Sequence, residues 1–92
     1  MTQPVTDHAT AVAVVREAIE CIAPDIDASS LPVDVDMRIE AELDSMDFMA
    51  VLSEIKERTG VDIPESDVAR VATIDGCAAR LVEQLTGSTT GT

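Results

Sequence analysis

The chain has 92 residues, enough for one small domain but too few for a deep enclosed active site. Eighteen acidic residues against six basic ones give a formal net charge of −12, which repels nucleic acids and anionic membranes and favours partners with basic surfaces. The alternative is that the acidity serves solubility alone. Hydrophobic residues make up 46% of the chain but Phe48 is the single aromatic, so we expect an aliphatic core and an all-α fold.

The two cysteines, Cys21 and Cys77, indicate a reducing compartment. They form no CxxC pair, and no hydrophobic leader follows Met1, so we expect a cytoplasmic protein. Each cysteine lies within a helical apolar pattern, which predicts two buried thiols rather than a disulfide. No stretch of the sequence is long and apolar enough to cross a membrane.

The first predicted helix follows residues 1–6, which we expect to be flexible. Asp7 can cap the N-terminus of this helix, and the helix should end near Pro24. Its apolar residues recur at spacings of three and four, as is typical of an amphipathic helix. These residues are Val12, Val15, Ala18, Ile19 and Ile22.

A long loop is predicted from Asp25 to Asp44, because acidic residues, serines and prolines alternate there with isolated apolar residues. A loop of this length in a small domain needs anchoring, so we expect its apolar residues to pack across the bundle. The alternation from Leu31 to Met37 also fits a short strand. The pair Asp25-x-Asp27 resembles the opening of a calcium-binding loop, but the required glycine and closing glutamate are absent, so no metal site is expected.

The next predicted helix begins at Ser45 and ends at Gly60. When its residues are placed about 100° apart, one arc is apolar and should face the core. This arc contains Phe48, Val51, Leu52, Ile55 and Thr59. The opposite arc carries two apolar side chains among acidic ones, and its residues are Met46, Ala50, Ser53, Glu54 and Glu57, with Asp47 beside them.

The remaining residues are predicted to form two helices and a tail. After a turn at residues 61–64, Ser66 or Asp67 should start a short helix that runs through Val71, and Thr73 should cap a last helix that closes before Gly87. The buried stripe of the last helix contains Ile74, Cys77, Ala78, Leu81, Val82 and Leu85. Residues 87–92 are expected to be disordered, which leaves 7–86 as the folded domain.

The tetrapeptide Asp44-Ser45-Met46-Asp47 is the strongest functional signal in the chain. Ser45 should lie in the first turn of its helix, where unpaired backbone N–H groups and the positive end of the helix dipole favour a phosphate on the serine hydroxyl. The plainer interpretation is an ordinary helix cap, in which Asp44 accepts backbone N–H bonds. Ser45 is therefore a candidate modification site.

With this helix start, the long loop and two downstream segments, the chain resembles acyl carrier proteins over roughly residues 8–85. The downstream segments are Thr59-Gly60-Val61-Asp62-Ile63-Pro64-Glu65 and Thr73-Ile74. The family's motif is Asp-Ser-Leu, and its serine bears a 4′-phosphopantetheine arm derived from coenzyme A. The resemblance implies a four-helix bundle of three longer helices and one short helix, a long loop between helices one and two, and attachment of the arm to Ser45.

Several positions depart from the family's pattern. Three residues before the serine the family usually has glycine, where this chain has Glu42, and one residue earlier it usually has leucine, where this chain has Ala41. Members of the fatty acid pathway also carry a denser acidic face along the second helix, which Ala50, Lys56 and Arg58 interrupt here. The departures argue against fatty acid synthesis, and the cargo is open among fatty acyl, polyketide and aminoacyl groups.

The resemblance also implies how the chain would work. Serine is a poor nucleophile without a base, and the only histidine, His8, lies at the start of the first helix. The chain is therefore not expected to be an enzyme, and a phosphopantetheinyl transferase would supply the base, Mg²⁺ and coenzyme A. Other implied partners are an acyl- or aminoacyl-loading ligase and downstream synthase or transferase enzymes with basic docking surfaces, which the chain would meet as a monomer. The expected contact residues are Asp44, Met46, Asp47, Ala50, Glu54 and Glu57.

Two other functions remain open at this point. An aminoacyl or peptidyl carrier protein would use the same prosthetic group with a different cargo. An acidic helical interaction module would carry no modification, so that Ser45 would be only a first-turn residue and the face around Met46 and Glu54 would bind a basic partner. Attachment of the arm distinguishes the second alternative from any carrier.

Overall fold

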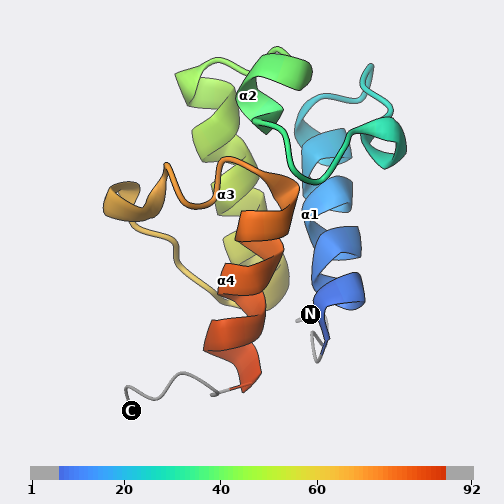
Figure 1. The fold of residues 1–92 in the computed structure, drawn as a ribbon. Coiled ribbons are helices and arrows are strands. Elements are labelled where there is room, and N and C mark those ends of the chain that lie inside the picture. The colour runs from blue at the N-terminus through green and yellow to red at the C-terminus, as the bar shows by residue number, and fades with distance from the viewer. Residues whose placement is uncertain (1–6, 87–92) are drawn as a thin grey trace.

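The computed structural model describes residues 7–86 and shows a bundle of three longer helices with one short helix at its end (Figure 1). In chain order the elements are α1 (His8–Ile22), the 3-10 turn η1 (Ala28–Ser30), α2 (Met37–Glu40), α3 (Ser45–Thr59), the 3-10 turn η2 (Glu65–Asp67) and α4 (Ile74–Thr86). Within residues 7–86 the only β-type pairing is one isolated bridge between Asp36 and Thr73. The all-α prediction is confirmed. The predictions for residues 1–6 and 87–92 lie outside the described part of the chain.

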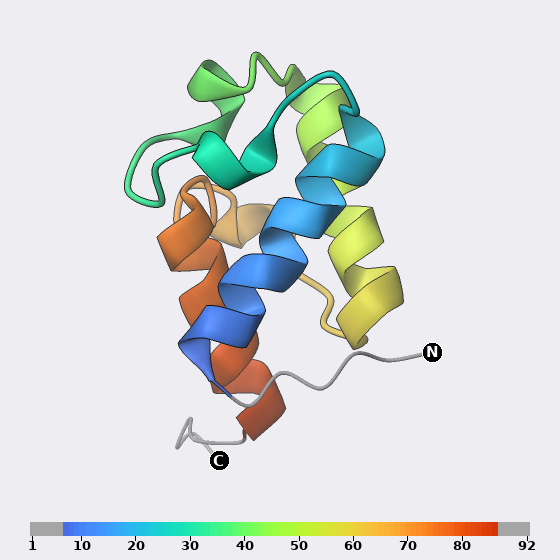
Figure 2. The ribbon, with the colours of Figure 1, turned by 90° about the vertical axis from the view of Figure 1, so that its right-hand side faces the viewer.

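Helix α1 begins and ends where the sequence indicated. The carboxylate of Asp7 accepts a hydrogen bond from the N–H of Thr10 at 2.8 Å, and the helix closes at Ala23, directly before Pro24. α1 packs against both α3 and α4, as the side view shows (Figure 2). Its fully buried residues are Ala11, Val14, Val15, Ala18 and Ile19. Val12 and Ile22 pack at the edge of this core.

The long segment between α1 and α3 is anchored by apolar side chains, as predicted, and also by a cation. Leu31 and Met37 are buried. Nη1 of Arg16 on α1 donates to the carbonyl oxygen of Leu31 at 2.9 Å and also to that of Ala28. The segment contains η1 and α2, which periodicity could not indicate because each is one turn long. The alternative of a strand from Leu31 to Met37 is wrong.

Backbone hydrogen bonds tie this segment to the start of α4. The N–H of Met37 donates to the carbonyl oxygen of Ala72 at 2.9 Å, and the N–H of Asp75 donates to the carbonyl oxygen of Val33 at 2.9 Å. The first bond fixes the N-terminus of α2 against the residues that precede α4. α2 therefore has a defined place at the end of the bundle.

Helix α3 buries the predicted arc and ends at the predicted glycine. Gly60 has φ +79°, the left-handed conformation that commonly closes a helix. The hydroxyl of Thr59 donates to the carbonyl oxygen of Ile55 at 2.8 Å and accepts from the N–H of Val61 at 3.2 Å, so this buried polar side chain is satisfied. The buried residues are Phe48, Val51, Leu52, Ile55 and Thr59.

The short helix predicted to run through Val71 is wrong in type and length. The only helical element there is the single 3-10 turn η2, and turns follow it, in which the N–H groups of Arg70 and Val71 donate to the carbonyl oxygen of Asp67 at 3.0 and 3.1 Å. Val71 is fully buried but Val68 is half-buried, so this stretch lacks the apolar stripe that holds a longer helix against a core.

Helix α4 follows its predicted cap and stripe. The hydroxyl of Thr73 accepts a hydrogen bond from the N–H of Gly76 at 3.0 Å. Val82 packs at the edge of the core, and the side chain of Leu85 lies outside the described part. The fully buried residues of α4 are Ile74, Cys77, Ala78 and Leu81.

The two cysteines lie in different environments, which corrects the expectation that both are buried. Cys77 is fully buried in α4, and this burial raises the pKa of its thiol to about 12. Cys21 in the last turn of α1 is exposed. The apolar pattern of α1 misled here because cysteine was counted as apolar although it lies beside the buried stripe rather than on it.

Candidate functional site

Ser45 is the first residue of α3, and it is exposed. Asp44 precedes it in an extended conformation and caps the helix. Its carboxylate accepts from the N–H of Asp47 at 2.8 Å, and its carbonyl oxygen accepts from the N–H of Phe48 at 2.9 Å. The predicted cap is confirmed, and it fixes the first turn so that the Ser45 hydroxyl stands at the positive end of the helix dipole.

Two buried apolar side chains also stabilise the first turn of α3. Leu43 lies directly before the capping residue and Phe48 is the fourth residue of the helix, the two positions of a hydrophobic staple. Leu43 is 6% exposed and Phe48 is 2% exposed. The sequence carried this signal as an apolar residue directly before the cap, but our prediction did not use it.

The chain approaches Ser45 through a strained residue. Glu42 has φ +54°, in the left-handed region that glycine adopts freely and other residues adopt at a cost of about 1 to 2 kcal/mol. This is the position where the resemblance led us to expect glycine. Ala41 beside it is buried, so the smaller side chain that replaces the expected leucine still faces the core.

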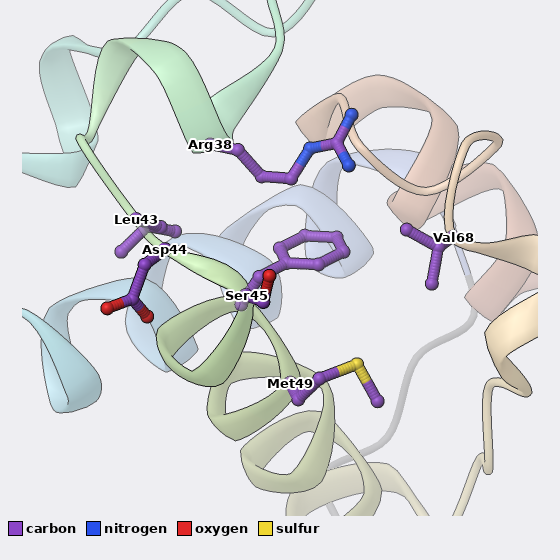
Figure 3. A pocket seen from close by; sticks show the side chains of 7 residues that line it. Arg38, Leu43, Asp44, Ser45, Met49 and Val68 are labelled. Carbon is purple, nitrogen blue, oxygen red and sulfur yellow. The ribbon is translucent and has the colours of Figure 1, made fainter.

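A pocket of about 550 Å³ opens beside Ser45 (Figure 3). This volume falls within the range of sites that bind small organic groups, roughly 300 to 1,000 Å³. Most of its lining side chains are apolar, with one cation and one anion among them. The lining residues are Arg38 from α2, Leu43, Asp44, Ser45, Phe48 and Met49 from the start of α3 and the residues before it, and Val68 from the segment after η2.

Arg38 is the main polar feature of the pocket that our prediction missed. Its Nε and Nη2 donate to the carboxylate of Asp36 at 3.0 and 2.8 Å, and its guanidinium carbon lies 5.6 Å from the centre of the Phe48 ring. The pair of hydrogen bonds lowers the pKa of Asp36 and raises that of Arg38. The signal in the sequence was that Arg38 is the only basic residue between Arg16 and Lys56.

Large apolar side chains are exposed on α2 and on the first turns of α3. Met46, a predicted contact residue, is 81% exposed, and the sequence did not indicate that Ile39 on α2 and Met49 on α3 are also exposed, at 73% and 37%. Asp44 and Asp47 are exposed beside them. Exposed methionines and an isoleucine beside carboxylates suit transient binding to a partner with apolar and basic groups.

The other predicted contact residues differ in how accessible they are. Glu57 is exposed, whereas Ala50 is half-buried. Glu54 is 26% exposed and its carboxylate accepts from Nε of Arg58 at 2.9 Å. Nη1 of Arg58 also donates to Glu17 on α1 at 2.9 Å. Arg58 therefore joins Glu54, on its own helix, to Glu17 on α1.

No histidine among the described residues lines the pocket around Ser45. The side chain of His8, the only histidine of the chain, lies with its Nε2 2.7 Å from the carboxylate of Asp75 on α4. Ser45 thus presents an accessible hydroxyl without an adjacent histidine base. This arrangement suits a serine that another protein modifies.

Residues 7–86 provide neither a cluster of metal ligands nor a membrane-spanning helix. They contain no group of three histidine, cysteine or acidic side chains placed to hold a metal ion. None of their helices combines the length and the apolar character that a membrane span requires.

The fold and the site define a small helical domain of the carrier type, in which the start of α3 exposes a serine. The family model for the phosphopantetheine attachment site matches residues 12–81, and the chain belongs to this family. The prosthetic group of the family is covalently bound 4′-phosphopantetheine. The chain is also similar to a protein named acyl carrier protein from Rubrobacter xylanophilus, with 26% identity over 61 residues that cover 66% of this chain and 75% of the relative. No solved structure matches.

The residues around Ser45 fit such a group. The hydroxyl of Ser45 is exposed at a helix N-terminus, where a phosphate is favoured, and a pocket of about 550 Å³ begins at the same residue. Arg38 adds one cation to the lining of that pocket.

Proposed function

We propose that this chain is an acyl carrier protein in which Ser45 carries the 4′-phosphopantetheine arm. The observation that supports this most is the position of Ser45, exposed at the first residue of α3 within the matched residues 12–81. The chain acts as a carrier and not as an enzyme, because its own side chains offer no histidine base beside the serine. When attached, the arm supplies a thiol that holds cargo as a thioester.

Attachment requires a separate phosphopantetheinyl transferase. The Ser45 oxygen forms a bond to the phosphorus of coenzyme A that bears the pantetheine group, the bond from that phosphorus to 3′,5′-ADP breaks, and the hydroxyl proton passes to a base on the transferase. Mg²⁺ bound by the transferase stabilises the charge that develops on the phosphates. This chain contributes the position of the hydroxyl, which the Asp44 cap fixes.

Partner recognition rests on the exposed residues around Ser45. Met46 and Ile39 supply apolar contacts, and Asp44, Asp47 and Glu57 face basic residues of the partners. The net charge of −12 makes association fast and sensitive to salt. The partners are the transferase, a loading ligase, and synthase or transferase enzymes of polyketide, fatty acid or other specialised metabolism, met by a monomer in the cytoplasm.

Intact-mass measurement tests the attachment. The purified apo protein is incubated with a broad-specificity transferase, Mg²⁺ and coenzyme A, and we expect the mass to rise by one phosphopantetheine. Ser45→Ala should gain nothing, whereas Ser53→Ala, which removes another exposed serine of α3, should load as the wild type does. An unmodified interaction module predicts no gain in any of the three proteins, and that result would reject the proposal.

The role of Met46 is tested by the loading rate. Met46→Asp should slow loading without a change in the free energy of unfolding, because the side chain is 81% exposed and contributes little to the core. Ser53→Asp adds the same charge farther along the helix and serves as the control. Equal loading rates for the two variants would remove Met46 from the recognition surface.

A further inference from the structure

Arg38 has donors left over after its contacts within the protein. Nε and Nη2 bind the carboxylate of Asp36, but Nη1 has no hydrogen-bond acceptor among residues 7–86. Arg38 nevertheless lines the pocket that contains Ser45 and is half-exposed, with 40% of its side chain accessible. A guanidinium group with unused N–H groups in a pocket is a binding group for an oxygen acceptor.

The position of this guanidinium group is fixed before any ligand binds. The carboxylate of Asp36 accepts from the backbone N–H of Arg38 at 2.9 Å as well as from its side chain. The backbone is fixed in turn by the 2.9 Å hydrogen bond from the N–H of Met37 to Ala72. The guanidinium carbon lies over the Phe48 ring. Little side-chain entropy is left to lose on binding, which favours recognition.

The pocket around Arg38 is otherwise suited to hydrocarbon. Leu43, Phe48, Met49 and Val68 line it with apolar surface. A saturated acyl chain would leave the unused N–H groups of Arg38 facing hydrocarbon, at the cost of their hydration. A chain that carries a carboxylate or carbonyl oxygen would pair with them. The pocket therefore combines apolar surface with one cation whose Nη1 donors lack an acceptor among the described residues.

Two oxygen-bearing groups could reach Arg38, the phosphate of the arm and the cargo at its end. The phosphorus of the arm lies one bond from the Ser45 oxygen, at the start of α3. Arg38 comes from α2 and lies across the pocket from Ser45 and Met49 (Figure 3). The thioester end of a long, flexible arm can fold back to that side. These positions favour the cargo over the phosphate as the group that Arg38 binds.

We propose that Arg38 is a specificity-determining residue that binds a carboxylate or carbonyl oxygen of the cargo, beyond the thioester, inside the pocket beside Ser45. The proposal rests on the proposed function, because the cargo reaches the pocket on an arm attached to Ser45. It assigns the substrate class as oxygen-bearing acyl groups in preference to saturated fatty acyl groups of equal length.

Nuclear magnetic resonance of the intact protein tests this. Four forms are compared: the apo protein, the protein with the bare arm, and the proteins loaded with hexanoyl or adipoyl groups, which have equal chain lengths and differ by a terminal carboxylate. We expect the Nε–H resonance of Arg38 to shift in the adipoyl form and to stay near its apo position in the other forms. The adipoyl form should also melt about 4 °C above the hexanoyl form.

Variants of the cation complete the test. Arg38→Met keeps an apolar stem over Phe48 but removes the guanidinium group, and should abolish the difference in melting temperature between the two acyl forms. Arg38→Lys keeps a cation and should retain part of the difference in melting temperature. Arg70→Met removes an exposed cation that does not line the pocket and should leave the difference intact.

Each other outcome overturns the proposal. Equal shifts in both acyl forms would mean that Arg38 does not distinguish an oxygen-bearing chain. A shift already complete with the bare arm would assign Arg38 to the phosphate or amides of the arm. No shift in any loaded form would leave Arg38 as a structural cap contact. Failure of the apo protein to accept the arm, seen by mass, would instead reject the proposed function itself.

Discussion

Arg58 near the end of α3 and Glu17 on α1 form an ion pair with 2.9 Å between Nη1 and the carboxylate oxygen. The same guanidinium group binds Glu54 one turn earlier on α3 at 2.9 Å. These contacts link α1 to α3 along the rim of their shared apolar interface. The carboxylate of Glu54 is thus occupied by Arg58. Glu54 is therefore less available to a partner protein than its position on the outer arc of the helix indicated.

The first prediction separates Glu54 from Glu57. Glu54→Ala should lower the free energy of unfolding by about 0.5 to 1 kcal/mol, because it removes an i,i+4 pair and leaves Arg58 with fewer partners. Glu57→Ala should change it by less, because that side chain is exposed. Urea unfolding of the apo proteins measures both. Equal stabilities would show that the network contributes nothing.

The second prediction concerns the left-handed residue before the serine. Glu42→Gly should stabilise the protein by about 0.5 to 1 kcal/mol, because glycine relieves the strain at φ +54° but loses more entropy on folding. Glu42→Ala removes the same charge and keeps the strain, so it should not stabilise. If the two variants were equally stable, the gain would come from charge and the conformational argument would be wrong.

The third prediction concerns the thiols. In the folded apo protein a thiol reagent should label Cys21 within minutes and leave Cys77 unlabelled, because Cys77 is buried and its pKa is raised to about 12. Cys21→Ser should remove the fast reaction, and denaturant should restore labelling at Cys77. Rapid labelling of two thiols without denaturant would contradict the buried position of Cys77.

The fourth prediction concerns acid stability. Arg38 lowers the pKa of Asp36 below its ordinary value of 3.8, so the contribution of this carboxylate is full above about pH 4 and is lost as the pH falls through the lowered pKa. Asp36→Asn should therefore be less stable than the wild type at pH 7, and the difference should shrink below about pH 4.

A matched control for this experiment is Asp34→Asn, which removes an equal charge from an exposed residue two positions earlier. Thermal melts from pH 2 to pH 7 follow both variants. A stability difference between Asp36→Asn and the wild type that stays constant across this range would show that the charge of Asp36 is not the cause.

The sequence was informative where the stabilising bonds are local. Asp7, Asp44 and Thr73 each accept from a backbone N–H three residues ahead, so the starts of α1, α3 and α4 could be predicted from neighbouring residues. The apolar arc of α3 was predicted for the same reason, because helical geometry alone decides which residues share a face. The composition also indicated the class of fold, since aliphatic side chains suit packed helices.

Local patterns failed where the partner is distant in the chain. α2 depends on a bond from Met37 to Ala72, and the place of the long loop depends on Arg16. The short helix predicted near Val71 is replaced by turns, because burial and not propensity decides whether such a stretch becomes a helix.

By itself, then, the sequence determined the three longer helices, the charge and the candidate serine, since caps, periodicity and motif spacing are properties of residues a few positions apart. Only the tertiary structure decided that Arg38 and Val68 line one pocket with Ser45 and that Arg58, which binds Glu54, also binds Glu17 on α1. Those relationships join segments that are far apart in the chain, and they exist only after the apolar faces of three helices have packed together.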